Sequence, residues 1–282
     1  MDETSVVAPR FDWRMTESYN MSIQLRLDGL SFSILDPVTN LYLALTDVTL
    51  PEPDPNFALQ EQYILNSQAL NKRYRKVFIC VDSPAYTLLP ISLFDEERVG
   101  SLFALNGIKL STDDKVLRNN IEMANSTTAF TIPNFLYFFL RTQFPNADIF
   151  HSTTPVISSM LLKRQGSVPT NQNVHVCLAD NCMTVTAVEN NELKLCNTFY
   201  CREVPDYTYM LLYAVEQLNF NLANVHFTIS GNVPESDKRL ATMRRFLPDM
   251  QMASLPTFFD YGFIVPERQY KFNALFLLPL CA

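Results

Sequence analysis

Two segments of the chain repeat the same alternation of apolar and polar residues. Residues 22–50 and 173–201 align without a gap at an offset of 151, so that Ile23 in the first corresponds to Val174 in the second. Alternation with a period of two is typical of strands with one buried face. Asn and Asp stand at the breaks between the apolar runs, where tight turns favour them. Each segment is therefore predicted to form a meander of three strands.

The same order of elements is predicted after each meander. A helix comes first, then an apolar strand, then a second helix that in the first half opens with a Ser92/Asp95 capping pair and ends at Gly107. In the first half the predicted helices are residues 56–71 and 92–107, and the predicted strand between them is 76–82. In the second half one helix begins at Pro205, the strand is 224–230, and the second helix is 236–247. Six elements in the same order predict a duplicated domain of β-β-β-α-β-α order.

The rest of the first half is less regular. Residues 116–132 are predicted to form a strand pair, residues 133–145 a buried helix, and residues 147–165 a short strand with a helix. A polar segment at 166–172 follows and is interpreted as a linker. The predicted domains are therefore residues 1–166 and 167–282.

A three-strand meander followed by an α-β-α crossover resembles the ribonuclease-H-like unit. Two such units in tandem resemble the superfamily of actin, sugar kinases and heat-shock chaperones. More narrowly, residues 86–107, 132–161 and 225–236 look like segments of an uncharacterised Bacteroidetes family with an actin-like ATPase fold. The resemblance implies an α/β fold with a mixed sheet in each half and ATP between the halves.

The resemblance also implies candidate nucleotide-binding residues. In this superfamily an Asp ends the first strand of each meander and a glycine two residues later admits the phosphate, with magnesium held through the Asp. Asp28 matches in the first half, but Gly29 follows it immediately. In the second half Asp180 and Thr184 match, but Cys182 stands at the glycine position. In this superfamily an apolar strand that ends in a glycine pair binds the adenosine, and this chain has only Ser230 and Gly231 at that place.

The cysteines allow two further hypotheses, a zinc site and a nucleophile. Cys177, Cys182, Cys196 and Cys201 form two C-x4-C pairs. Structural zinc usually takes a closer C-x2-C pair, and cysteines five apart on one strand point to opposite faces. His175 could share a sheet face with Cys177 and act as its base. Buried apolar packing is preferred for all of them, with no metal and no catalytic residue expected.

Charge and termini limit the partners and the location. The formal net charge is −7 with the charges interspersed, which disfavours nucleic-acid binding. The N-terminus has no signal-peptide pattern, so a cytoplasmic location is expected. The apolar tail at 272–282 is shorter than the ~20 residues of a membrane-spanning helix and contains Pro279. It is expected to pack on the protein, without membrane insertion.

Aromatic residues are densest at 134–140 and 257–263, where core packing is preferred and a surface for a partner is the alternative. Only 6 of 282 residues are glycine, which disfavours loops that hold phosphate with backbone N–H groups. The preferred hypothesis is a non-catalytic actin-like protein that needs no cofactor and acts by binding a protein, by self-association or as a scaffold. The alternative is a divergent ATPase or switch that binds Mg-ATP in the cleft between the domains.

Overall fold

The computed structural model describes residues 1–162, 171–247, 249–262, 264 and 268–281. The chain forms two compact units. The first comprises Met1–Pro155, Pro256–Pro266 and Ala274–Ala282, and the second comprises Val156–Leu255 and Glu267–Asn273. The predicted boundary between residues 166 and 167 lies outside the described residues. The units differ from the predicted domains because the chain returns to the first unit after residue 255.

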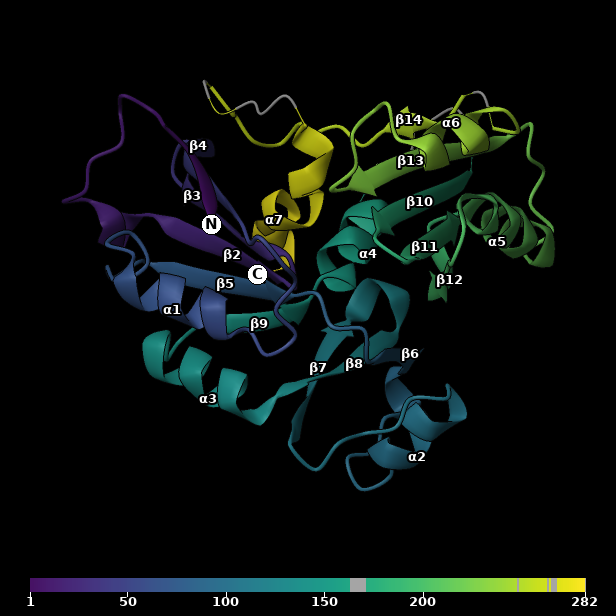
Figure 1. The fold of residues 1–282 in the computed structure, drawn as a ribbon, viewed down its shortest axis with the longest axis horizontal. Coiled ribbons are helices and arrows are strands. Elements are labelled where there is room, and N and C mark those ends of the chain that lie inside the picture. Colours follow the sequence, from purple (N-terminus) through teal and green to yellow (C-terminus); the bar gives the residue numbers. More distant parts are fainter. Residues whose placement is uncertain (163–170, 248, 263, 265–267, 282) are drawn as a thin grey trace. The chain divides into compact units, whose positions relative to one another are not determined.

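A six-stranded sheet in the order β1-β4-β3-β2-β5-β9 forms the centre of the first unit (Figure 1). The predicted meander is β2, β3 and β4, which pair antiparallel, and β5 and β9 continue the sheet in parallel. The strands are β1 (Asp2–Val7), β2 (Asn20–Arg26), β3 (Gly29–Asp36), β4 (Leu41–Thr49), β5 (Lys76–Val81) and β9 (Asp148–His151), with a 3-10 turn at Thr16–Ser18. The apolar face of the meander is buried through residues such as Ile23, Leu25 and Ile34.

Helix α1 (Ala58–Asn66) is shorter than the predicted helix at 56–71. Phe57 precedes it in the left-handed conformation, with φ at +56°, and Ser67 after it is extended. The side-chain amide of Asn71 donates to the carbonyl oxygens of Ile64, Leu65 and Ser67. The helix thus ends where the backbone becomes extended, and Asn71 satisfies carbonyl groups of the last turn that have no partner within the helix.

A three-stranded sheet is inserted after β5, in the order β6-β8-β7. It consists of β6 (Tyr86–Pro90), β7 (Asp114–Ile121) and β8 (Ser126–Pro133), with a 3-10 turn at Glu122–Ala124 before β8, so the predicted strand pair at 116–132 is confirmed. Helix α2 (Val99–Leu105) packs here through Phe103.

The predicted start of α2 at Ser92 is wrong. Residues Ile91–Leu93 form a 3-10 turn, and no side chain caps α2 at Arg98. Asp95 instead accepts a hydrogen bond from the Glu97 N–H at 2.9 Å. A local turn around Asp95 therefore separates the two helical pieces, while the predicted end at Gly107 agrees with its φ of +71°.

Helices α3 (Asn134–Gln143) and α4 (Thr153–Leu162) precede and follow β9 in the chain, as predicted from the sequence. The prediction of a buried helix at 133–145 is only partly correct, because Phe135 and Phe138 of α3 are exposed. In the second unit, α6 (Lys238–Arg244) lies between β13 (Val225–Gly231) and β14 (Gln251–Met252) in the chain. These two strands pair in parallel as β5 and β9 do. By position in the sheet, α3 rather than α2 therefore corresponds to α6. The order β-β-β-α-β-α recurs in both halves, with β6, α2, β7 and β8 inserted between β5 and α3 in the first.

The second unit contains a five-stranded sheet in the order β12-β11-β10-β13-β14. Its elements are β10 (Gln172–Ala179), β11 (Cys182–Glu189), β12 (Glu192–Tyr200), α5 (Val204–Gln217), β13 (Val225–Gly231) and β14 (Gln251–Met252). Its apolar face, with Val176 and Val185, forms a core with Leu211 of α5 and Leu240 of α6. Buried polar side chains alternate with these apolar ones, among them His175, Thr186 and Ser230.

The C-terminal tail forms the turns Gln269–Phe272 and Leu278–Cys281 around α7 (Asn273–Leu277). In the first unit, the Tyr42 hydroxyl donates to the Phe276 carbonyl oxygen at 3.0 Å, and its ring stacks on Tyr261. The prediction that the tail packs on the protein is confirmed for its described part, where Leu275, Phe276 and Leu278 are buried. No helix of the described residues is long and apolar enough to cross a membrane.

Candidate functional site

The hairpin that joins β10 to β11 is a two-residue turn. Ala179 pairs with Cys182, which leaves only Asp180 and Asn181 in the turn, and Asn181 has a φ of +62°. The Asn181 carbonyl oxygen accepts a hydrogen bond from the Cys201 N–H at 2.9 Å. The Asp180 side chain is 97% exposed. The turn is thus held by its backbone, and its carboxylate faces solvent.

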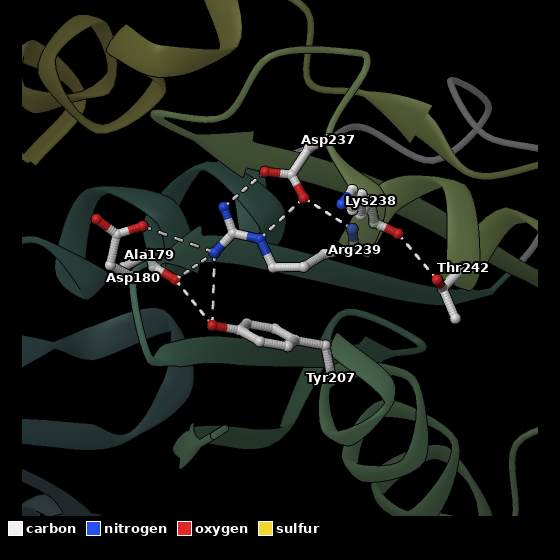
Figure 2. Close-up of polar contacts among 7 residues, drawn as sticks. All are labelled: Ala179, Asp180, Tyr207, Asp237, Lys238, Arg239 and Thr242. Atoms are coloured by element: carbon white, nitrogen blue, oxygen red, sulfur yellow. Dashed lines mark hydrogen bonds and ion pairs between the residues drawn. The ribbon is translucent and has the colours of Figure 1, made fainter. Parts of the chain in front are cut away.

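Arg239 of α6 reaches back to this turn (Figure 2). Its Nη1 donates to the Ala179 carbonyl oxygen at 2.8 Å, while its Nε and Nη2 bond the Asp237 carboxylate at 2.9 and 2.7 Å. The guanidinium also lies 5.2 Å from the centre of the Tyr207 ring, and the Tyr207 hydroxyl donates to the same Ala179 oxygen at 3.2 Å. Asp180 is farther away, at 3.9 Å from Nη1. This cluster, the Arg239 clamp, fixes the hairpin to the two helices.

The Arg239 clamp carries little net charge. Hydrogen bonds from Arg239 lower the pKa of Asp237, because they favour its ionised form. The hydrogen bond to Asp237 in turn raises the pKa of Arg239. The two side chains therefore remain an ion pair at neutral pH, and most of the charge of Arg239 is balanced within the protein.

A pocket of about 500 Å³ opens beside the clamp. Its charged lining is balanced between three acids and three bases: Asp180, Glu203 and Asp237, and Arg202, Lys238 and Arg239. At the start of α5, Asp206 accepts hydrogen bonds from the N–H groups of Arg202 and Glu203. The Asp206 carboxylate of the helix therefore occupies these backbone donors. The hydrogen bonds from Glu203 and Arg202 favour the ionised form and lower the pKa of Asp206.

The two predicted hydroxyl ligands of this half bond within the sheet. Thr184 Oγ1 lies 2.8 Å from Thr198 Oγ1 on β12. Ser230 Oγ is buried and lies 2.8 Å from His175 Nε2, and the other ring nitrogen of His175 lies 3.0 Å from Thr228 Oγ1. Both hydroxyls thus serve cross-strand pairing within the sheet.

Gly29 and Gly231, the two glycines among the candidate nucleotide-binding residues, lie against neighbouring strands. A Cβ at Gly231, where φ is +115°, would clash with the Leu178 carbonyl oxygen of β10. A Cβ at Gly29, where φ is +151°, would clash with the Val48 carbonyl oxygen of β4. Both positions need glycine because two backbones approach closely there.

Asp28 belongs to a buried polar network in the first unit. Arg26 Nε donates to Asp28 at 2.9 Å, and its Nη1 and Nη2 donate to Ser31 at 2.6 Å and Asp47 at 3.2 Å. Burial lowers the pKa of Arg26, but the acids around it, Asp28 first, raise it overall. Arg26 is thus a buried cation held by carboxylates, and Asp28 is one of its partners.

Sequence reasoning missed two residues near these hairpins, Asp82 and Arg239. Asp82 follows β5, its Oδ2 accepts from Gln24 at 3.5 Å, and its buried Oδ1 has no hydrogen-bond partner among the described residues. Burial raises the pKa of Asp82. Its position at the carboxyl end of an apolar strand was a usable signal. Arg239 gave none, because its partner Ala179 is 60 residues away.

None of the six cysteines, all of which lie within the described residues, forms a disulfide. Among described residues, no group of three or more His, Cys, Asp or Glu side chains is placed to hold a metal. Cys196 Sγ accepts from Thr186 at 3.5 Å, and Cys201 Sγ donates to the Phe199 carbonyl at 3.6 Å. Burial raises the pKa of Cys201 to about 11, so this thiol is protonated at neutral pH.

Two of the solved structures that resemble this chain indicate its class. A Bacteroides thetaiotaomicron protein of unknown function with an actin-like ATPase fold is 25% identical, with a TM-score of 0.74 over 86% of this chain and 93% of the other. The PilM–PilN type IV pilus biogenesis complex gives 9% identity and a TM-score of 0.53 over 93% and 96%. The protein therefore has the actin-like ATPase fold.

A family model places the chain more narrowly. The chain belongs to the family described as protein of unknown function, DUF3822, whose model matches residues 8–250. No curated protein matches the chain.

Proposed function

We propose that this protein acts by binding another protein and does not hydrolyse a nucleotide. The observation that carries the proposal is that the candidate nucleotide residues serve the fold. Asp28 bonds Arg26, Thr184 bonds Thr198, and Ser230 bonds His175. Gly29 and Gly231 allow strands to approach each other. Phosphate binding at Ser230 would have to break its contact with His175, and a buried group left unpaired costs about 1–3 kcal/mol.

The exposed side of α3 supports a protein-binding role. Leu136 and Leu140 are buried, whereas Phe135 and Phe138 are 46% and 64% exposed. Residues three apart share one side of a helix, so these two rings form one apolar surface, the α3 patch. Exposed aromatic side chains are enriched at protein interfaces. The PilM–PilN complex is a precedent for a protein partner on this fold, although its 9% identity supports only the fold.

Asp180 favours a second candidate function, a nucleotide switch that binds Mg-ATP. Its carboxylate is exposed at a pocket that also contains Arg202 and Lys238. An exposed carboxylate suits a magnesium ion with its water shell, and the two cations suit phosphate oxygens. In this function Asp180 is the essential side chain.

Thermal unfolding with and without Mg-ATP separates the two functions. A ligand at about 100 times its dissociation constant stabilises the folded state by about 2.7 kcal/mol. We expect no change in melting temperature with ATP, ADP or GTP. A rise that disappears in Asp180→Ala would establish the nucleotide switch and contradict our preference.

The partner surface is tested with the variant Phe135→Ser/Phe138→Ser. In extract of the native cells, we expect cross-linking to capture a specific protein with the wild type and to lose it with this double variant. Leu65→Ser on α1 is the matched control, since Leu65 is 54% exposed and lies outside the α3 patch. Equal capture by all three proteins would exclude the α3 patch as the binding surface.

A further inference from the structure

Strand β1 is an exposed edge of the first sheet. It pairs with β4 on one side, and no strand among the described residues pairs with its other side. All six of its residues are exposed. Such an edge presents unpaired backbone groups that can bind another strand.

The alternation of the backbone identifies the groups that point outward. The Ala8 N–H donates to the Leu43 carbonyl oxygen of β4 at 2.8 Å. Backbone groups alternate in direction along a strand, so those of Thr4 and Val6 also point to β4. The N–H and C=O groups of Glu3, Ser5 and Val7 therefore point away from the sheet.

This edge has few of the features that usually prevent edge-to-edge pairing, and its two charged residues, Asp2 and Glu3, lie together at one end. Strand β1 has the sequence DETSVV, without Lys, Pro or Gly, and its pairing with β4 has no irregularity. The other edge strands carry such features. Lys194 of β12 lies beside an irregular pairing at Ala187/Val188, and β7 carries Lys115 and Arg118. Strand β6 ends at Pro90, and β9 and β14 are short. Such features protect natural sheet edges, so β1 is the edge best suited to pairing.

We infer that β1 pairs antiparallel with β1 of a second copy of this chain, about a two-fold axis through Ser5. Ser5 then lies opposite the second copy's Ser5, and Glu3 lies opposite its Val7. Each of the three outward residues forms a narrow pair with two hydrogen bonds. The inference goes beyond the proposed function, because it concerns a second copy and a surface separate from the α3 patch.

The charges along β1 favour this register. Asp2 and Glu3 form the acidic end of the strand, and Val6 and Val7 form an apolar end that is 38% and 48% exposed. In the antiparallel pair the two acidic ends are far apart, and Asp2 lies opposite the uncharged Ala8. Like charges directly opposite each other destabilise a strand pair. A parallel pair would align the acids.

Sedimentation velocity over a range of concentrations tests the dimer with two matched variants at one residue. Ser5→Pro removes an outward N–H, whereas Ser5→Ala keeps it, and both lose the bond from Ser5 Oγ to Thr46 Oγ1. We expect a concentration-dependent dimer for the wild type and Ser5→Ala and a monomer for Ser5→Pro. A wild type that stays monomeric, or equal dimerisation of the two variants, would overturn the inference.

Cross-linking tests the register without proline. Opposed residues of a narrow pair have Cα atoms about 5.5 Å apart, a separation that a disulfide spans. We expect Ser5→Cys to give a covalent dimer on mild oxidation, and Thr4→Cys, which lies opposite Val6, to give no more than the wild type with its native thiols. Equal cross-linking of Ser5→Cys and Thr4→Cys, or none from Ser5→Cys, would reject the pairing.

Discussion

Gly231 lies opposite Leu178 in the parallel pair of β13 and β10, so close that a Cβ at position 231 would clash with the Leu178 carbonyl oxygen. Its φ of +115° is also unfavourable for any residue with a side chain. Strain of this kind costs about 1–3 kcal/mol, and a contact with backbone adds to it. We expect Gly231→Ala to lower the free energy of unfolding by about 3 kcal/mol, measured by urea denaturation.

Gly100→Ala is the matched control for this prediction. A Cβ at Gly100, inside α2, meets no atom within 4 Å, and its φ is not positive. Alanine is favoured over glycine in a helix by about 0.5–1 kcal/mol, so this variant is expected to be slightly more stable. Equal effects of the two substitutions would contradict the close-approach explanation for Gly231.

The Arg239 clamp depends on the fork shape of its guanidinium, which bonds Asp237 and the Ala179 carbonyl at once. Lysine keeps the charge but cannot make both contacts in this geometry. We expect Arg239→Lys to reduce the free energy of unfolding by about 1–2 kcal/mol, the cost of one or two lost hydrogen bonds.

Arg98→Lys provides the comparison for Arg239→Lys. The Arg98 side chain is 82% exposed, and its contact with Asp95 at 3.5 Å is open to solvent. Exposed ion pairs contribute little, so the expected change is near zero in the same urea titration. If both lysine variants unfold at the wild-type midpoint, the clamp does not stabilise the hairpin.

The sequence was sufficient for the parts of the fold that depend on local periodicity. Alternation revealed both meanders, and the apolar spacing from Tyr207 revealed α5. It failed at α2, because Ser92 and Asp95 have the composition of a helix cap but form a separate turn. Capping patterns alone do not decide between a helix start and a turn.

The candidate site was less predictable for a physical reason. Position along a hairpin places Asp180 at the first turn of the second meander, but the partner of a side chain depends on the strand or helix beside it. Ser230 bonds His175, 55 residues away, and Arg239 bonds Ala179. The resemblance to the superfamily implies adenosine binding at Gly231, whereas its neighbour in the structure is the backbone of Leu178.

His151 is a buried neutral histidine at the end of β9. Its Nε2 lies 2.9 Å from the Ser83 carbonyl oxygen, and its Nδ1 lies 2.7 Å from Thr153 Oγ1. A carbonyl only accepts, so Nε2 carries the proton and Nδ1 accepts. Burial lowers the pKa of His151 to about 4, against an ordinary value of 6.5.

This lowered pKa predicts a pH-dependent stability. The unfolded chain binds a proton at His151 below about pH 6.5, whereas the folded chain binds it only near pH 4. The neutral His151 therefore contributes fully to the free energy of unfolding above pH 6.5, and this contribution is lost as the pH falls towards 4. At 1.36 kcal/mol per pKa unit, the loss over this window is about 3 kcal/mol. His151→Gln does not titrate, so the difference in unfolding free energy between wild type and variant should change by this amount between these pH values. All other side chains are common to the two proteins, so their contributions cancel in that difference. Parallel stability curves would show that His151 does not change its protonation on unfolding.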